Sequence, residues 1–436
     1  MTNDTSARSL ADRSSATGRP LRVLTITTLY PNAVTPSHGV FVENRLRALA
    51  ASGAVDLKVV APVPWFPSAN PLFGHYATHA RVPAAEIRHG IAVSHPRYPA
   101  IPRVGMTVAP SLLYAALRRA LKRTPPGPID LIDAHYVYPD GVAAAMLGRK
   151  LGVPVVITAR GTDVNLIPRH ALPRRQIQWA ARQAAGLITV CSALKDALID
   201  LEVEPGKIRV IRNGVDLRTF HPAPEPDGRD AARNRFGVRR KLLLSVGQLI
   251  ERKGHRYAIE ALTRLPDWEL IIAGHGPDHA MLTTLAERLG VGERVRLLGA
   301  VSHDALPALY TAADALVLAS SREGWANVLL EAMACGTPVI ATAVWGTPEV
   351  VSGPEAGVLM RDRSADAVVE ALEQLAQTHP GRAATRAYAE RFSWDQTTRD
   401  QIDLFTRIVQ AGETPGTGAR TPWPGQGDAA DAASTG

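Results

Sequence analysis

Two glutamates give this sequence its strongest chemical signal. Glu323 and Glu331 stand eight residues apart, on either side of a glycine-containing turn and the start of a predicted helix. Carboxylates accept charge-assisted hydrogen bonds from pairs of hydroxyls, and the free N–H groups at a helix start favour an anionic diphosphate. One carboxylate could therefore hold a sugar hydroxyl while the other holds a ribose diol. Such pairs also occur by chance on helices, so their position directly after the predicted strand Ala315–Ala319 is what favours a site.

Cations form the second part of the signal. Glu251-Arg252-Lys253-Gly254 follow the predicted strand Leu242–Val246, in the first βα turn of the second half of the chain. Cleavage of a nucleotide sugar leaves a diphosphate, whose additional negative charge must be stabilised by preorganised positive groups. The compact ammonium of Lys253 at this edge could supply that charge. An Arg-Lys pair is also common on ordinary protein surfaces, so its place at a strand end is again the argument.

The first half of the chain carries further polar residues at predicted strand ends. Gly39 lies near a helix N-terminus, where the missing side chain lets a phosphate approach the backbone closely. His135 ends one predicted strand, and Arg160 and Asp163 follow the next one, so the three side chains could converge on a substrate. A single glycine is not the G-x-G-x-x-G fingerprint, which argues against a nicotinamide-dependent oxidoreductase.

Residues at the carboxyl ends of strands can lie together at one edge of a sheet if the strands are parallel neighbours, and the sequence has the pattern of such a sheet. Short β-branched runs alternate with longer amphipathic segments, which predicts βα units on parallel sheets. In the first half we predict strands at Leu21–Thr28, Val55–Ala61, Ile91–His95, Leu131–His135, Val155–Ala159, Gly186–Cys191 and Ile208–Arg212. In the second half we predict strands at Leu242–Val246, Glu269–Ala273, Val295–Leu298, Ala315–Ala319, Val339–Ala341 and Gly357–Met360. Ligands of such doubly wound domains bind outside the carboxyl ends of the strands, where the candidate residues stand.

A segment rich in Pro, Asp and Gly, His221–Gly228, separates the two halves. We therefore expect a disordered leader (1–20), a first domain (21–220), a linker (221–230), a second domain (231–392), a C-terminal capping helix (393–411) and a disordered tail (412–436). The sequence leaves open which domain the last helix caps.

Composition limits the partners and the compartment. The net charge of +8 calls for an anionic partner, and no apolar run approaches the roughly 18 residues that cross a bilayer. The first twenty residues lack the apolar core of a secretory signal. Both cysteines, Cys191 and Cys335, lie in apolar segments, which favours a reducing compartment. We expect a cytoplasmic protein.

A basic stretch surrounds the predicted helix Ser111–Lys122. Its cations have Glu86 as a nearby acid and are Arg81, Arg88, Arg97, Arg103, Arg118, Arg119, Lys122 and Arg123. Because leucines and a tyrosine are interleaved with them, the stretch could rest on anionic lipid headgroups. A solvated face of a buried helix is an equally good interpretation.

With these residues in place, the chain resembles the retaining glycosyltransferases of family 4, which have the two-domain α/β fold called GT-B. The resemblance spans nearly all of Arg22 to Phe405. It is carried by His-Gly-Val at 38–40, Ala-His at 134–135, Arg-Gly-Thr-Asp at 160–163, Ser-Ala-Leu-Lys at 192–195, Arg-Asn-Gly-Val-Asp at 212–216, Gly-His-Gly-Pro at 274–277 and the block 323–338. It implies two Rossmann-like, doubly wound domains facing across a cleft, the first for the acceptor and the second for the nucleotide-sugar donor.

The resemblance also implies roles by position. Glu331 would hold the donor ribose and Glu323 the sugar hydroxyls near the reacting carbon. Lys253 would neutralise the departing diphosphate, Gly39 would admit it, and His135 would touch the transferred sugar. Further donor contacts would be Arg252, Gln248, Gly299, Val301, Gly324, Trp325, Ala326 and Asn327, and acceptor-side contacts would be Arg160 and Asp163. No metal or other cofactor is implied, and the sugar would be transferred with retention through an oxocarbenium-like state.

The sequence departs from the family pattern in three places. Gln248 stands where an arginine is usual, so one diphosphate cation is missing, and either Arg252 or an arginine of the first domain is expected to compensate. Trp325-Ala326 replace Phe-Gly, which bears on sugar selectivity, and Arg160 replaces a histidine, which adds positive charge near an anionic acceptor.

The expected partners are a UDP- or GDP-linked sugar and a glycan or lipid-linked acceptor, with the protein peripheral on the cytoplasmic membrane face during assembly of a surface polysaccharide. The alternatives are a GT-B sugar-nucleotide epimerase, which would need no acceptor, and a non-catalytic nucleotide-sugar binding protein. Nucleic acid is disfavoured because only 5% of residues are aromatic and no basic-aromatic stacking platform is evident.

Overall fold

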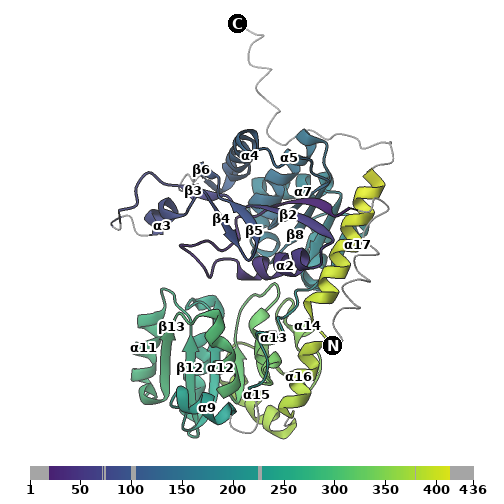
Figure 1. Ribbon diagram of the computed structural model, residues 1–436. Coiled ribbons are helices and arrows are strands. Elements are labelled where there is room, and N and C mark those ends of the chain that lie inside the picture. Colours follow the sequence, from purple (N-terminus) through teal and green to yellow (C-terminus); the bar gives the residue numbers. More distant parts are fainter. Residues whose placement is uncertain are drawn as a thin grey trace. The chain divides into compact units, whose positions relative to one another are not determined.

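The computed structural model describes residues 19–412, except residues 71, 73–74, 100–104, 224–227 and 379. The chain forms two compact units (Figure 1). The first extends to Ile211 and resumes at Thr397, and the second comprises Arg212–Gln396.

The first unit is built on an eight-stranded sheet with the order β10-β9-β8-β7-β1-β2-β5-β4. Its strands are β1 (Leu21–Ile26), β2 (Val55–Val60), β4 (Ala85–Arg88), β5 (Ile91–Ser94), β7 (Leu131–His135), β8 (Val155–Ala159), β9 (Gly186–Thr189) and β10 (Ile208–Val210). All neighbours pair in parallel except β4, which pairs antiparallel with β5 at the sheet edge. Because β1 pairs with both β2 and β7, the direction of winding reverses beside β1, which is where such sheets bind ligands.

Helices cover both faces of this sheet (Figure 1). They are α2 (Val40–Ala51), α4 (Gly105–Arg123), α5 (Val142–Leu151), α6 (Thr162–Asn165), α7 (Ala171–Gln183), α8 (Ser192–Ile199) and α17 (Trp394–Gly412), while α3 (His75–Arg81) accompanies a small sheet of β3 (Val63–Trp65) and β6 (Arg97–Pro99). On α2, Val42, Leu46 and Leu49 recur at helical spacing and are fully buried. They share one apolar core with Leu404 and Phe405 of α17. The last helix therefore caps the first unit.

The second unit has a six-stranded sheet with the order β13-β12-β11-β14-β15-β16, parallel throughout. Its strands are β11 (Lys241–Val246), β12 (Trp268–Ala273), β13 (Val295–Gly299), β14 (Ala315–Leu318), β15 (Val339–Thr342) and β16 (Gly357–Met360). Its helices are α9 (Gly228–Arg235), α10 (His255–Ala261), α11 (His279–Arg288), α12 (Leu306–Ala312), α13 (Asn327–Ala334), α14 (Thr347–Val350), α15 (Ala365–Thr378) and α16 (Arg382–Glu390). The winding reverses between β11 and β14, so the loops after these two strands flank the expected ligand crevice.

Every strand predicted from the pattern is present, with ends that differ by at most two residues. The pattern missed β3, β4 and β6, which are three or four residues long. No helix of the described part of the chain has the length and apolar character needed to span a membrane.

The boundaries of the units differ from the predicted ones. The units divide at Ile211, ten residues before the predicted linker at 221–230, because the chain has already joined the second unit. Val215 forms a β-bridge with Ser393, and the Phe220 carbonyl accepts a hydrogen bond of 2.6 Å from Arg386 Nη1. The helix predicted over 393–411 is α17. Most of the predicted leader and nearly all of the predicted tail lie outside the described residues.

Candidate active site

The carboxyl edge of the second sheet brings the two strongest sequence signals together. β11 and β14 are neighbours, and the loops that follow them carry Lys253 and Glu323. Lys253 Nζ lies 2.6 Å from Glu323 Oε1, and Arg252 Nη1 lies 3.6 Å from the same oxygen. Two cations and one carboxylate therefore stand at the point where the winding of the sheet reverses.

The charges in this cluster support one another. Glu323 is 9% exposed, and such burial by itself raises the pKa of its carboxyl. The charge and hydrogen bond of Lys253 outweigh that penalty, so the pKa of Glu323 lies below its ordinary value. Glu323 is thus held as a carboxylate at neutral pH, and Lys253 keeps two of its three N–H donors for other partners.

The loop that carries Lys253 is held by Gly254 and His255. Gly254 has a φ of 70°, and a Cβ there would lie 2.1 Å from the Ala319 carbonyl oxygen, so only glycine lets the loop meet the end of β14. His255 is buried, with Nδ1 2.8 Å from Ser245 Oγ and Nε2 3.0 Å from the Gln248 carbonyl oxygen. Burial lowers the pKa of His255 to about 4, so the ring is neutral where it bridges Ser245 and the Gln248 carbonyl. The Gln248 side chain is exposed, and its backbone carbonyl is the group that orders the loop.

Glu331 lies in the second turn of α13. Its Oε2 accepts a hydrogen bond of 2.8 Å from the Tyr310 hydroxyl, and burial raises the pKa of its carboxyl above the ordinary value. The residues before it form the turn into α13, in which the Trp325 carbonyl accepts from the Asn327 N–H at 3.1 Å. Trp325 is buried against Phe392, with ring centroids 6.0 Å apart, so this indole packs inside the second unit.

The remaining donor-side predictions lie on the same unit. Gly324 and Ala326 belong to the turn before α13, and Ala326 is buried. Gly299 ends β13, and its carbonyl accepts from the Gly274 N–H at 2.8 Å, while the half-buried Val301 follows in the next loop. The Gly299 carbonyl is therefore hydrogen-bonded within the second unit.

In the first unit, the predicted His135 is enclosed on both sides. Its Nε2 lies 2.9 Å from Asp133 Oδ2, and its Nδ1 is hydrogen-bonded to the Arg160 guanidinium. Since a guanidinium only donates, Nδ1 must accept and Nε2 must carry the proton. Burial lowers the pKa of His135 to about 4, and the nearby charge of Arg160 adds to that effect. His135 is therefore a neutral, fully buried ring with both nitrogens engaged, which leaves no ring nitrogen for the transferred sugar in this geometry.

Arg160 and Asp163 also have internal partners. The Arg160 guanidinium lies over the Phe41 ring, 5.5 Å from its centroid, and the residue is 9% exposed. Asp163 is fully buried and accepts from the Val137 N–H at 2.7 Å, the Gly161 N–H at 2.7 Å and the Arg160 N–H at 3.1 Å. In the structure, Asp163 therefore holds the loops after β7 and β8 together. Its contact with an acceptor stays a prediction.

Gly39 precedes α2 with a φ of 75° and is buried. A Cβ at this position would lie 2.4 Å from the carbonyl carbon and oxygen of Leu29, so the glycine is required by the loop after β1. Its approach to a phosphate stays a prediction.

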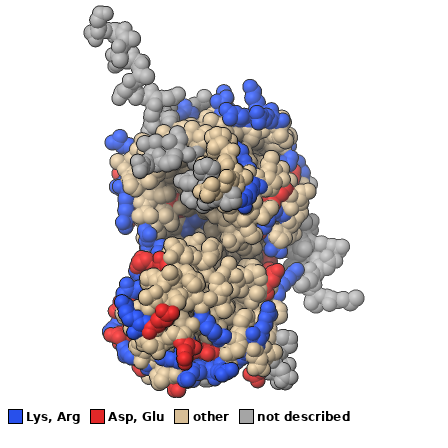
Figure 2. Space-filling model, turned by 90° about the vertical axis from the view of Figure 1, so that its left-hand side faces the viewer, with Lys and Arg blue, Asp and Glu red and all other residues tan. Residues whose placement is uncertain are grey.

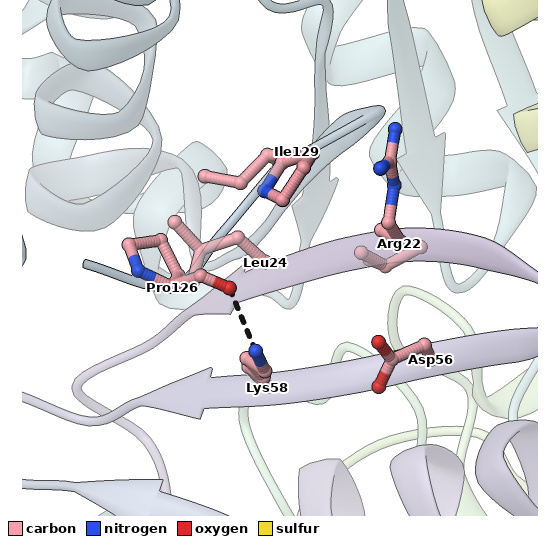
Figure 3. Close-up of a pocket in the computed structure, with 8 residues that line it drawn as sticks. Arg22, Leu24, Asp56, Lys58, Pro126 and Ile129 are labelled. Carbon is pink, nitrogen blue, oxygen red and sulfur yellow. Dashed lines mark hydrogen bonds between the residues drawn. The ribbon is translucent and has the colours of Figure 1, made fainter.

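The structure also shows a surface pocket in the first unit (Figure 3). Its lining comes from β1, β2 and the segment before β7, and Lys58 Nζ donates to the Pro126 carbonyl at 2.7 Å across it. None of the candidate residues lines it. Among the described residues, no group of three or more His, Cys, Asp and Glu side chains is arranged to hold a metal ion.

Four residues that lie beside the candidate residues were not predicted from the sequence. In the second unit, Tyr310 contacts Glu331 and His255 contacts Ser245. In the first unit, Arg45 and Gln401 are bonded to each other, and Arg45 Nε donates to Gln401 Oε1 at 2.8 Å. The signal for Gln401 was present, because this polar residue falls on the apolar stripe of α17 beside Leu404 and Phe405.

Comparison with known proteins identifies the family of the chain. Residues 38–219 match the model of Glycosyltransferase Family 4, and residues 228–392 match that of the glycosyl transferases group 1. TuaC of Bacillus subtilis (strain 168), provisionally assigned as a teichuronic acid biosynthesis glycosyltransferase, is 30% identical over 81% of this chain and 88% of its own length. The D-inositol 3-phosphate glycosyltransferase of Mycolicibacterium gilvum (strain PYR-GCK) is 32% identical over 68% of this chain and 70% of its own length.

Solved structures agree on the fold. Sucrose-phosphate synthase from Thermosynechococcus elongatus has a TM-score of 0.73 at 22% identity and covers 90% of this chain and 100% of its own. Anabaena HepE, solved in complex with UDP-glucose, has a TM-score of 0.67 at 20% identity and covers 88% of this chain and 98% of its own. The chain has two α/β units with largely parallel sheets and polar clusters at the strand ends. Together with these relatives, this places the chain in glycosyltransferase family 4, as a glycosyltransferase with the GT-B fold.

Proposed function

We propose that this enzyme transfers a hexosyl unit, with retention of configuration, from a UDP- or GDP-linked sugar to a glycan or lipid-linked acceptor. The observation that carries the proposal is the contact of Lys253 and Arg252 with Glu323 at the winding reversal of the second sheet. A diphosphate leaving group needs fixed positive charge, and a sugar ring needs a carboxylate that binds hydroxyls. Both are present within one small cluster.

Each residue of this cluster has a place in the reaction. Lys253 neutralises the departing diphosphate with the donors that Glu323 does not use, and Glu323 holds hydroxyls near the reacting carbon. Glu331 takes the ribose diol, with its second oxygen fixed by Tyr310. The bond from the sugar to the diphosphate breaks, and an acceptor hydroxyl attacks the same face through an oxocarbenium-like state while its proton passes to the departing diphosphate oxygen. Backbone groups near Gly299 and Val301 hold the base, and no metal is required.

Arg252 is proposed to replace the cation that Gln248 lacks. Its Nη1 donates to the Arg322 carbonyl at 2.8 Å and lies 3.6 Å from Glu323, so the guanidinium is anchored within reach of the same anion. The exposed Gln248 amide could still hydrogen-bond a phosphate oxygen as a neutral group.

The relatives support the classes of donor and acceptor. HepE is described with UDP-glucose and TuaC with teichuronic acid biosynthesis, so a nucleotide sugar and a surface polysaccharide are the proposed donor and product class.

The basic end of α4 supports action at the cytoplasmic face of a membrane. Arg118, Arg119, Lys122 and Arg123 are exposed on the last turns of α4, and Met106 and Val108 are exposed at its start. Figure 2 shows basic side chains gathered along the upper end of the first unit, the end at which Figure 1 draws α4 and α5. Two other basic residues of this stretch have partners inside the fold: Arg88 pairs with Glu43 at 2.6 Å, and Arg97 donates to the His79 carbonyl at 2.5 Å. Arg81 is exposed, and Arg103 lies outside the described residues.

Flotation with liposomes tests the membrane part of the proposal. Vesicles that contain phosphatidylglycerol should carry the protein upward at low salt, and replacement of the four basic residues of α4 by glutamine should abolish that movement. Wild-type protein that stays at the bottom of the gradient at low salt would contradict membrane binding.

Thermal stabilisation by a panel of UDP-, GDP- and ADP-sugars tests the donor. A ligand at a hundred times its dissociation constant adds about 2.7 kcal/mol of apparent stability. One donor should raise the melting temperature of the wild type and of Glu373→Ala, an exposed glutamate on the same unit, but not of Glu331→Ala. With NAD and an RNA oligomer as controls, a shift by one of these but by no sugar nucleotide would overturn the proposal. The anomeric configuration of the product, read by NMR, then tests retention.

A further inference from the structure

The end of β7 contains a residue in a backbone conformation that its side chain disfavours. Tyr136, directly after β7, has φ 95° and ψ 119°. These angles lie outside the left-handed helical region near φ 57° and ψ 47°, which non-glycine residues visit in turns. Three other described non-glycine residues with positive φ, His89, Glu202 and Trp345, have φ between 48° and 64°, close to that region. Tyr136 is therefore the most strained of the four.

Hydrogen bonds on both sides hold this conformation. The Tyr136 N–H donates to the Thr158 carbonyl at 2.9 Å, and the Tyr136 carbonyl accepts from the Gly141 N–H at 2.9 Å. The next residue is fixed as well, because the Val137 N–H donates to Asp163 at 2.7 Å. Strain that the surroundings impose in this way is characteristic of residues whose side chain is aimed for function.

The position of Tyr136 makes it available where His135 is not. Both ring nitrogens of His135 are engaged inside the fold, whereas the Tyr136 side chain is only half-buried. Thr162 and Asp163, which follow the adjacent strand β8, act on its phenol, so the ring stands at the ends of two adjacent strands. A half-buried phenol at this edge keeps part of its surface for a ligand.

We propose that Tyr136 is the residue of the first unit that contacts the transferred sugar, with its hydroxyl bonded to a sugar hydroxyl and its ring against the sugar's apolar face. This inference rests on the proposed function. It reassigns to Tyr136 the contact that family resemblance assigns to His135, and it gives a reason for the distorted end of β7. Burial raises the pKa of the Tyr136 phenol, so it acts as a neutral donor and acceptor.

Strain can be tested without a substrate. At an ordinary position alanine is more stable than glycine, but at a strained position the order reverses because glycine accepts the conformation. The Tyr136→Gly protein should therefore unfold at a higher temperature than Tyr136→Ala. The opposite order would remove the strain argument.

Contact with the sugar is tested by acceptor-free hydrolysis of the sugar nucleotide that stabilises the wild type in the thermal panel, measured as nucleotide release. Tyr136→Phe keeps the ring and should lower kcat about tenfold, the value of one neutral hydrogen bond, with little change in KM. Tyr138→Phe is the matched control, because the Tyr138 hydroxyl is bonded inside the fold to Gln176 at 2.9 Å. It should lower stability but leave kcat near the wild-type value.

The outcomes separate the inference from the proposed function. Wild-type hydrolysis with equal kcat in Tyr136→Phe overturns the inference and leaves the function intact. Unchanged hydrolysis with slower transfer to an acceptor also overturns it, since Tyr136 would then meet the acceptor. A wild type that neither binds nor hydrolyses any sugar nucleotide overturns the proposed function, and the inference with it.

Discussion

Lys253 Nζ lies 2.6 Å from Glu323 Oε1, and the two residues come from loops after β11 and β14, the strands at which the second sheet reverses its winding. Seventy residues of chain separate them, so the contact is a product of the fold. Because Glu323 is 9% exposed, its negative charge depends on this partner.

Removal of Lys253 should lower the rate of the reaction while the nucleotide base still binds. We expect Lys253→Ala to lower kcat by a factor of about 10² to 10³, the usual loss when one preorganised charge at a leaving group is removed. Arg252→Ala should have a smaller effect, because its guanidinium lies 1.0 Å farther from Glu323 Oε1 (3.6 Å against 2.6 Å). Steady-state kinetics with the identified donor measure both, and a larger loss in Arg252→Ala would contradict the assignment.

The same pair should influence acid stability. The pKa of Glu323 is lowered in the folded protein, so the pair contributes stability above the unfolded pKa of about 4.3 that is lost as pH falls through the folded pKa. In Lys253→Ala this contribution disappears, and the free energy of unfolding should then vary less between pH 3 and 5. Urea titrations at a series of pH values would show the difference, and identical pH profiles for the two proteins would count against it.

Gln401 should stabilise the first unit far more than its type suggests. It is fully buried, its Oε1 accepts from Arg45 Nε at 2.8 Å, and its Nε2 donates to Asp133 Oδ2 at 3.3 Å. Gln401→Leu leaves two buried charged groups without these partners and should cost about 2–4 kcal/mol in urea unfolding. Gln410→Leu, on the exposed part of the same helix, should change stability by less than about 0.5 kcal/mol. Equal effects would show that α17 is held by its apolar stripe alone.

Buried histidines and a buried aspartate should give stability opposite slopes with pH. The pKa values of His135 and His255 are about 4 in the fold, below the ordinary 6.5, so stability present above pH 6.5 is lost as pH falls toward 4. Burial raises the pKa of Asp140 to about 8, so its contribution falls as pH rises from 4 to 8. Asp140→Asn should remove that second slope. Ring ¹⁵N shifts at pH 6 should show His135 neutral with the proton on Nε2, and a charged ring would contradict the contact with Arg160.

The sequence predicted the sheets well and the internal contacts poorly, for physical reasons. Buried parallel strands such as β11 are short apolar runs, so their positions can be read directly from the pattern. Glu323 and Lys253 could be predicted as neighbours because each follows a strand at the same sheet edge. Asp163 could not be assigned from sequence, because a short carboxylate in a turn can bind either a ligand or the backbone of its own loop, and only the fold decides.

The boundary between the units shows a related limit. Proline and glycine in His221–Gly228 report irregular backbone, but the unit boundary depends on long-range contacts. Those contacts change at Ile211, before the composition does, and Phe220 is already buried against Tyr310, with ring centroids 5.9 Å apart.

Gly39 and Gly53 form a matched pair that separates a need of the fold from a need of the ligand. Both have positive φ, 75° and 70°, so an alanine at either position carries a similar conformational penalty of about 1–2 kcal/mol. A Cβ at Gly53 has no atom within 4 Å, whereas a Cβ at Gly39 would lie 2.4 Å from the Leu29 carbonyl. We therefore expect Gly53→Ala to lose about 1 kcal/mol and Gly39→Ala to lose several, or not to fold, because the clash is with backbone that cannot turn aside. If Gly39→Ala is instead as stable as Gly53→Ala but no longer binds the donor, then this glycine is present for the phosphate, and the loop after β1 must be able to move away from it.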